Sequence, residues 1–141
     1  MKEKKKNKIE SKNIVLILGI VYTLITILAI ISYVSKMNSI STTPVTFSTV
    51  LGAIWWQILM IVLFAITYIL YNKKKMFGTL LEIMMGIAML IYIVISVAQM
   101  GINFLALLIE LIYPLILVFH GLKELKTVNK KTKIKRKRST I

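Results

Sequence analysis

The chain has 141 residues, of which 57% are hydrophobic and only 17% are charged. A soluble domain normally has about a quarter of its residues charged, and here the charges form short blocks separated by long uncharged runs. That segregation is typical of an integral membrane protein rather than a soluble one. There are no cysteines, so disulfides, thiolate catalysis and cysteine metal sites are excluded.

Four apolar runs follow one another along the chain, each close to the roughly 20 residues that cross a bilayer as a helix. They cover about residues 13–34, 49–71, 77–97 and 102–122. The first is expected to be a membrane anchor, because its apolar core exceeds the roughly 7 to 15 residues of a signal peptide. The third and fourth predict a helical hairpin that turns near Gly101. The expected fold is therefore an all-α membrane protein built as a four-transmembrane-helix bundle.

Basic residues predict the orientation of these spans. In a four-span arrangement, eighteen of the 19 Lys and Arg residues fall on one side, and only Lys36 falls on the other. By the positive-inside rule, that side is the cytoplasm. We therefore expect a basic cytoplasmic tail over residues 1–12, a membrane domain over 13–122 and a second basic cytoplasmic tail over 123–141.

Each expected span has one face of small or polar residues, which is the kind of face that packs helices together in lipid. Three of the faces follow alternating steps of three and four residues, as in a left-handed bundle. The third face has four-residue steps, which suit a close crossing. The four faces are Gly19, Tyr22, Thr26, Ala29 and Tyr33; Ala53, Gln57, Met60, Phe64, Thr67 and Tyr71; Gly78, Glu82 and Gly86; and Asn103, Ala106, Glu110, Tyr113, Leu117 and His120.

The register of the hairpin predicts specific contacts between the third and fourth spans. Antiparallel helices that turn near residue 100 would bring Glu82 opposite residues 118–120 and Gly86 opposite Tyr113 and Pro114. A contact between Glu82 and His120 is then expected near the cytoplasmic boundary, because an imidazole can pair with a carboxylate. We expect Glu82 to lie close enough to the interface to reach water.

Glu110 is the strongest functional candidate, because ionisable groups inside a membrane are costly to keep. A buried carboxyl favours its neutral form unless a cation or hydrogen-bond donors hold the charge, and no Lys or Arg lies within a span. Tyr22, Thr26 and Tyr113 lie at similar depths. We expect a protonated Glu110 hydrogen-bonded across the bundle, with ion binding or contact with another subunit as alternatives. Pro114 leaves the Glu110 carbonyl without its helical donor. The candidate intramembrane polar site comprises Glu110, Tyr113, Glu82 and His120.

The C-terminal tail contains a dense basic run. Beside a span, such a run determines topology or contacts anionic lipid headgroups. The candidate headgroup contacts are Lys130, Lys131, Lys133, Lys135, Arg136, Lys137 and Arg138. Leu122, Leu125 and Val128 predict that the last helix continues for a turn or two along the interface before the tail frays. The single histidine cannot form a metal site alone, and no cofactor is expected.

The sequence has no phosphate-binding glycine loop and no HExxH or GxSxG motif, so an enzyme is not expected. In its four-span layout, lysine-rich ends and Lys-, Ile- and Asn-rich composition, the chain resembles small uncharacterised four-span membrane proteins of low-GC Gram-positive bacteria. Some of those proteins confer immunity to membrane-active peptides. The resemblance implies an accessory or protective protein that binds another membrane component. The alternatives are a holin-like pore former and a minimal transporter or channel subunit that uses Glu110.

The expected partners follow from the membrane location. They are the bilayer with its anionic headgroups, and either another membrane protein or a second copy of the chain. Nucleic acid is not an expected partner, because the basic run lies immediately beside a span.

Overall fold

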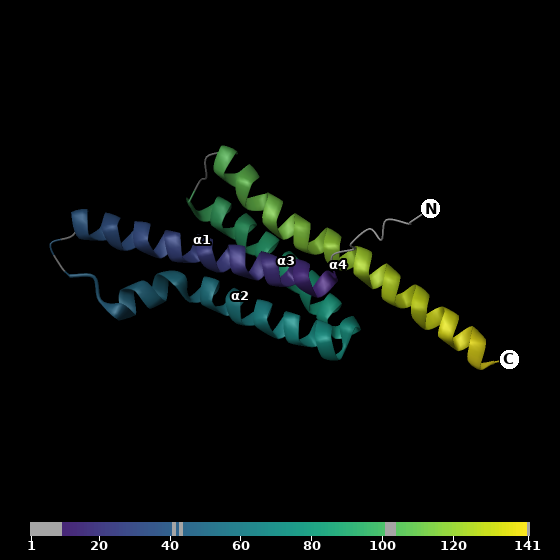
Figure 1. The fold of residues 1–141 in the computed structure, drawn as a ribbon. Helices are drawn as coiled ribbons and strands as arrows, with labels where there is room; N and C mark the ends of the chain where they lie inside the picture. The colour runs from purple at the N-terminus through teal and green to yellow at the C-terminus, as the bar shows by residue number, and fades with distance from the viewer. Residues whose placement is uncertain (1–9, 41, 43, 101–103, 141) are drawn as a thin grey trace, which may run out of the picture. The chain divides into compact units, whose positions relative to one another are not determined.

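The computed structural model of the chain describes residues 10–40, 42, 44–100 and 104–140, and this part of the chain is helical apart from short connections. The four helices are α1 (Ser11–Ile40), α2 (Phe47–Lys73), α3 (Lys75–Met100) and α4 (Phe104–Ser139) (Figure 1). Within the described residues, three helices are long and apolar enough to cross a membrane: α1, α2 and α3 up to Gln99. The prediction of an all-helical membrane protein is confirmed at this level.

The connection between α2 and α3 is a single residue, Lys74. The amide of Lys74 donates to the Leu70 carbonyl at 2.7 Å, and the Lys74 carbonyl accepts from the Phe77 amide at 3.0 Å. These hydrogen bonds satisfy backbone groups at the end of α2 and at the beginning of α3, which would otherwise lack partners. The predicted turn between α3 and α4 at Gly101, and the fourth-face residue Asn103, lie outside the described residues.

The structure divides into two compact units, of which the first is Met1–Ala65. In this unit α1 and α2 pack through the predicted faces. A Cβ placed on Gly19 of α1 would lie 3.3 Å from the Phe64 side chain of α2, and the rings of Tyr22 and Phe64 have their centroids 5.7 Å apart. Phe64 and Met60 are buried, as is Thr26. Because Gly19 has no side chain, the rings of Tyr22 and Phe64 have room to pack between α1 and α2.

The second unit, Ile66–Ile141, contains the end of α2 with α3 and α4. Here α3 and α4 approach closely at two glycines. A Cβ on Gly86 would lie 2.6 Å from a Val118 methyl and 3.0 Å from the Pro114 carbonyl oxygen, and a Cβ on Gly121 would lie 2.6 Å from Ile83. Each helix therefore offers a glycine to a branched side chain of the other. The expected contact between Gly86 and Pro114 is confirmed.

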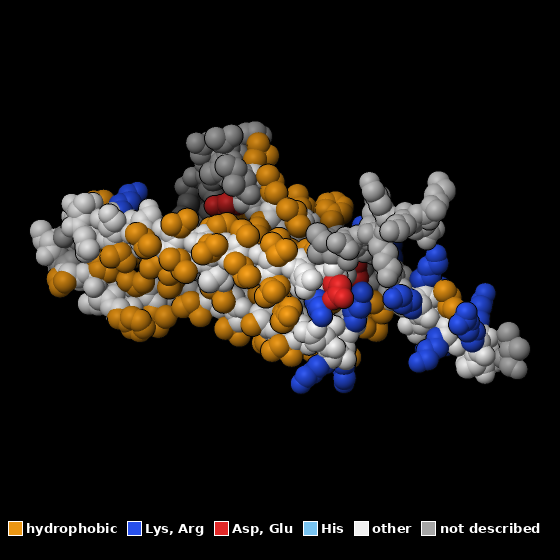
Figure 2. All heavy atoms as spheres, in the orientation of Figure 1, with side chains coloured by type: hydrophobic (Ala, Val, Ile, Leu, Met, Phe, Trp, Pro, Cys, Tyr) orange, Lys and Arg blue, Asp and Glu red, His pale blue; other side chains and the backbone are white. Residues whose placement is uncertain are grey.

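The outward surface of the helices is apolar, as Figure 2 shows for one face. Leu28, Met84 and Phe119 are each about two-thirds exposed, at 66%, 65% and 67%. A water-soluble protein rarely exposes a continuous apolar surface of this kind. Side chains that face outward in this way are those that hydrocarbon would solvate in a membrane.

The C-terminal end of α4 differs from the prediction. The helix does not fray after Val128 but continues to Ser139, and all residues from 129 to 140 are exposed. Their Lys and Arg side chains contribute to helix formation because long unbranched side chains lose little freedom in a helix. Positive charge at the end of a helix is also favoured by the helix dipole.

We expect Gly86→Ala to weaken the packing of α3 against α4, because the new methyl group meets the Pro114 carbonyl oxygen, a backbone atom that cannot rotate away. Overpacking of this kind costs about 1–3 kcal/mol. Unfolding of the purified protein in mixed micelles, followed by circular dichroism, measures the change.

Gly52→Ala is the matched control, because a Cβ on Gly52 would have no atom within 4 Å. This variant should be as stable as the parent or slightly more stable, since alanine is the better helix former. Equal stability of the two variants would show that Gly86 does not define the contact.

Candidate functional site

The candidate site centres on Glu82, which lies on α3 between two glycines that open the helix to its neighbours. Its side chain is fully buried, with 0% exposed. Four residues before it, a Cβ on Gly78 would lie 2.8 Å from the Tyr71 amide nitrogen of α2; four residues after it, Gly86 meets α4. The face of Gly78, Glu82 and Gly86 thus carries a carboxyl group into the space between three helical segments. The prediction that Glu82 reaches water is wrong, since glycines on both sides let α2 and α4 close over it.

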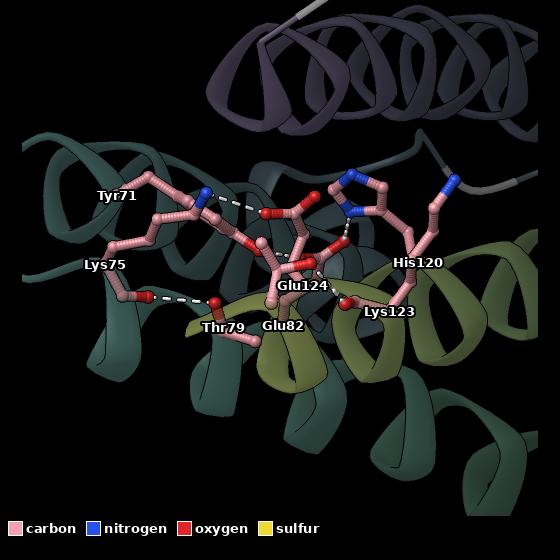
Figure 3. Close-up of polar contacts among 8 residues, drawn as sticks. Tyr71, Lys75, Thr79, Glu82, His120, Lys123 and Glu124 are labelled. Carbon is pink, nitrogen blue, oxygen red and sulfur yellow. Dashed lines mark hydrogen bonds and ion pairs between the residues drawn. The ribbon is translucent and has the colours of Figure 1, made fainter. Parts of the chain in front are cut away.

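Both oxygens of the Glu82 carboxyl group have partners, and the two partners come from different helices (Figure 3). Tyr71 of α2 donates its hydroxyl to Oε2. His120 of α4 places Nδ1 2.6 Å from Oε1. The predicted contact between Glu82 and His120 is therefore confirmed, and it is part of a three-helix cluster rather than a pair. We call Tyr71, Glu82 and His120 the carboxyl cluster.

One proton lies between Oε1 and Nδ1 in either form of the pair. An ionised Glu82 can only accept, so Nδ1 must then carry the proton and donate it; a protonated Glu82 can instead donate to Nδ1. The other ring nitrogen, Nε2, is buried and makes no hydrogen bond with the residues that the structure describes.

An ion pair lies beside the carboxyl cluster at the same end of α3. Lys75 Nζ lies 2.7 Å from Oε2 of Glu124 on α4, with the two side chains 41% and 13% exposed. The Thr79 hydroxyl, one turn along α3, donates to the Lys75 carbonyl at 2.9 Å (Figure 3). The ion pair joins the beginning of α3 to α4. It lies at the end of the α3–α4 contact that has more charged residues.

Glu110 lies apart from this cluster, ten residues before His120 on α4, which corresponds to about 15 Å along a helix. Its side chain is exposed. It makes no hydrogen bond or ion pair with any residue in the described part of the chain. Within its own unit, Ile66–Ile141, Glu110 therefore lacks the predicted hydrogen bond among the described residues, and a bond to Tyr22 or Thr26 of the other unit stays a prediction. Of the proposed donors, Thr26 gives its hydroxyl to the Tyr22 carbonyl at 2.9 Å, and Tyr113 is half-buried.

Two further predictions involve the site's surroundings. The seven candidate headgroup contacts all lie on the exposed end of α4, and contact with lipid stays a prediction. Within the ranges that the structure describes, no three His, Asp or Glu side chains come together as a metal site. Ala106, a member of the fourth predicted face, has a side chain outside the described part.

Tyr71 is the member of the cluster that sequence reasoning missed. Its place on the face of small or polar residues of the second span predicts packing between helices and not a hydrogen bond to Glu82. A signal was nevertheless present: helices that turn tightly at residues 74–76 bring Tyr71 opposite Glu82 and Thr67 opposite Met85. The second contact is also formed, with the Thr67 hydroxyl 3.3 Å from the Met85 sulfur.

No protein-family model matches the chain, and no curated protein or solved structure matches it either. The candidate site therefore has to be interpreted from its own geometry.

We expect Glu82→Leu and His120→Leu each to destabilise the protein by about 3–5 kcal/mol, because each change leaves a buried polar group without its partner. The double variant should cost clearly less than the two single changes together, since it removes both members of the pair. Unfolding in mixed micelles gives the four free energies that the cycle requires.

The control is Lys12→Met, which breaks the exposed ion pair between Lys12 and Glu10. This change should cost no more than about 1 kcal/mol. Strictly additive effects of the two leucine substitutions would show that Glu82 and His120 do not act as a pair.

Proposed function

We propose that the chain is a small non-enzymatic protein of the cell membrane that acts by binding another membrane component through α4. In this proposal, α4 is the fourth span, both termini are cytoplasmic, and the role is accessory or protective, as in immunity to membrane-active peptides. Three observations support it: three helices have the length and apolarity of spans, the basic residues are strongly segregated, and Glu110 is exposed in an apolar run.

The proposal depends mainly on the exposed carboxyl group of Glu110. Its neighbours on α4 include Leu108, Ile112 and Leu115, which are also exposed, at 45%, 57% and 40%. Such a surface suits lipid, but a carboxyl group among these side chains does not, because hydrocarbon offers it no hydrogen-bond donor. An acidic residue at the centre of a span costs about 2.5–3.5 kcal/mol on insertion scales. A partner that supplies a donor or a cation would recover part of that free energy.

The carboxyl cluster supports the same proposal by a different route. Glu82 has its donors within the protein, on α2 and α4, so the hairpin of α3 and α4 can be held in place without an external ligand. Glu110 is the remaining acidic group within the apolar part of α4. A rigid helix then presents one carboxyl group to the membrane, which is how an interhelical hydrogen bond selects a partner in lipid.

The proposed orientation also brings basic residues to the headgroup level. Lys73, Lys74 and Lys123 would lie at the cytoplasmic ends of spans, and each base near an anionic surface contributes about 1 kcal/mol. We propose that anionic headgroups are partners of this end of the protein.

The absence of cysteine allows the topology to be tested by introducing single cysteines. In intact cells, Thr42→Cys and Gln99→Cys should react with a membrane-impermeant maleimide, whereas Asn72→Cys and Ser139→Cys should react only after lysis. All four positions are exposed in the structure. Reaction of Ser139→Cys in intact cells, with Asn72→Cys protected, would mean three spans instead of four.

We expect Glu110→Gln to reduce the recovery of a complex after gentle detergent extraction by about tenfold or more, because a charged hydrogen bond of about 1.5–3 kcal/mol is replaced by a weaker one. Protection against membrane-active peptides should fall in parallel. Size-exclusion chromatography with mass measurement and a survival assay give the two readouts.

Glu10→Gln is the matched control, because it makes the same chemical change at an exposed carboxylate outside the apolar runs. It should leave recovery unchanged. Recovery of the parent protein only as a monomer, or equal recovery of the Glu110→Gln variant, would contradict the proposal. A complex that contains only copies of this chain and lyses cells would favour the holin-like alternative.

A further inference from the structure

The end of α4 carries a straight line of lysines that no fold contact explains. Lys123, Lys126, Lys130, Lys133 and Lys137 follow steps of three, four, three and four residues along one continuous helix. Residues at this spacing lie on one face of a helix. All five are exposed, and none forms an ion pair with a residue that the structure describes. We call these five residues the lysine stripe; at 1.5 Å per residue it is about 21 Å long.

The helix that carries the stripe extends past the rest of its unit (Figure 1). The ion pair between Lys75 and Glu124 places residue 124 level with the beginning of α3. Beyond Val128 every described residue is exposed, and Lys and Arg side chains gather along this end in Figure 2. The stripe therefore lies on a projecting helix and not on a tail folded back against α3.

The length of the projecting helix limits which of its side chains can contact lipid headgroups. If α4 leaves the membrane near Lys123 and runs along the membrane normal, Lys133 lies about 15 Å beyond the boundary and Arg138 about 22 Å beyond it. The attraction of an anionic surface decays over a Debye length of about 8 Å at physiological ionic strength. The first two lysines of the stripe are within reach of headgroups, but the outer ones are not.

Like charges repel one another along the projecting helix. After Glu124 the chain has no acidic residue, so Lys126 and Lys130, and likewise Lys133 and Lys137, are like charges four residues apart. Pairs of this kind destabilise a helix by a few tenths of a kcal/mol each, and a short helix without tertiary contacts is marginal by itself. A counter-surface with negative charges in a line would remove the repulsion and stabilise the helix.

We propose that the lysine stripe is the docking surface for an acidic helix of a cytoplasmic protein, with carboxylates at the same spacing of three and four residues. The proposal rests on the cytoplasmic location of the C-terminus that the proposed function includes. Two helices packed side by side meet along a seam of this spacing, and opposite charges on the seam select the partner and its orientation. Ile134, 47% exposed, lies between Lys130 and Lys137 on this side of the helix and offers an apolar contact within the seam.

The test uses the full chain in nanodiscs of neutral phosphatidylcholine and two fluorescent peptides. One helical peptide carries five glutamates at steps of three and four residues; the other has the same composition with its glutamates distributed around the helix. Anisotropy titration should give tighter binding of the first peptide. Substitution of Lys130, Lys133 and Lys137 by Gln should weaken its binding by about fivefold or more, which is the loss expected for three exposed ion pairs.

A charge-preserving variant separates the stripe from net charge alone. Exchange of Asn129 with Lys130 and of Thr132 with Lys133 moves two lysines off the stripe without changing the number of charges. This variant should lose affinity for the first peptide, whereas substitution of Lys131, Lys135 and Arg138 by Gln, which leaves the stripe intact, should lose less. Equal binding of the two peptides by the parent, or unchanged binding by the charge-preserving variant, would overturn the proposal.

Headgroup binding is tested in the same system. A fluorophore at Ser139→Cys should be insensitive to replacing part of the phosphatidylcholine with phosphatidylglycerol, since residue 139 is expected to lie beyond the surface potential. A change that places the fluorophore at the headgroups would assign the tail to lipid and overturn the proposal. Labelling of Ser139→Cys in intact cells separately tests whether the C-terminus is cytoplasmic. An error in the proposed topology and an error in the proposed docking surface therefore give different results.

Discussion

A carboxyl group buried between helices must obtain its hydrogen bonds from the protein, because neither hydrocarbon nor a packed interior offers it water. Glu82 obtains them from Tyr71 on α2 and His120 on α4. The requirement fixes more than one contact. It sets how far α3 slides along α2, how far it slides along α4, and which face of each helix turns inward, since a shift of one residue would separate the oxygens from their donors.

The glycines are the second part of the same arrangement. Gly78 lets the backbone of α2 approach α3, and Gly86 and Gly121 let α3 and α4 approach each other. Without side chains at these positions, Glu82 is enclosed and the branched side chains of Ile83 and Val118 fill the space opposite the glycines. Close packing of this kind is what stabilises helices in lipid, where burial of apolar surface contributes little between helices. The polar cluster and the glycine contacts therefore depend on each other.

This division of roles distinguishes two of the acidic residues of the hairpin, Glu82 and Glu110. Glu82 is held on both sides and is suited to fixing the register of the helices. Glu110 has no described partner and is exposed among apolar side chains, so it is suited to recognition. The exposed end of α4 adds a third chemistry, since its basic side chains form no ion pair with the residues that the structure describes. One helix thus contributes to the buried cluster, to the proposed contact in the membrane and to the proposed contact in the cytoplasm.

Apolar run lengths and charge placement by themselves determined the helical class, the approximate start of each helix and part of the faces that pack, because these depend on local composition and on the period of the helix. Even the contact between Glu82 and His120 followed from the length of the hairpin. The tertiary structure alone decided that Tyr71 completes the cluster, that Glu82 is enclosed while Glu110 is exposed, and that α4 continues to Ser139. The physical reason is that burial depends on how closely neighbouring helices approach, which glycine contacts between helices control and which no single helix specifies.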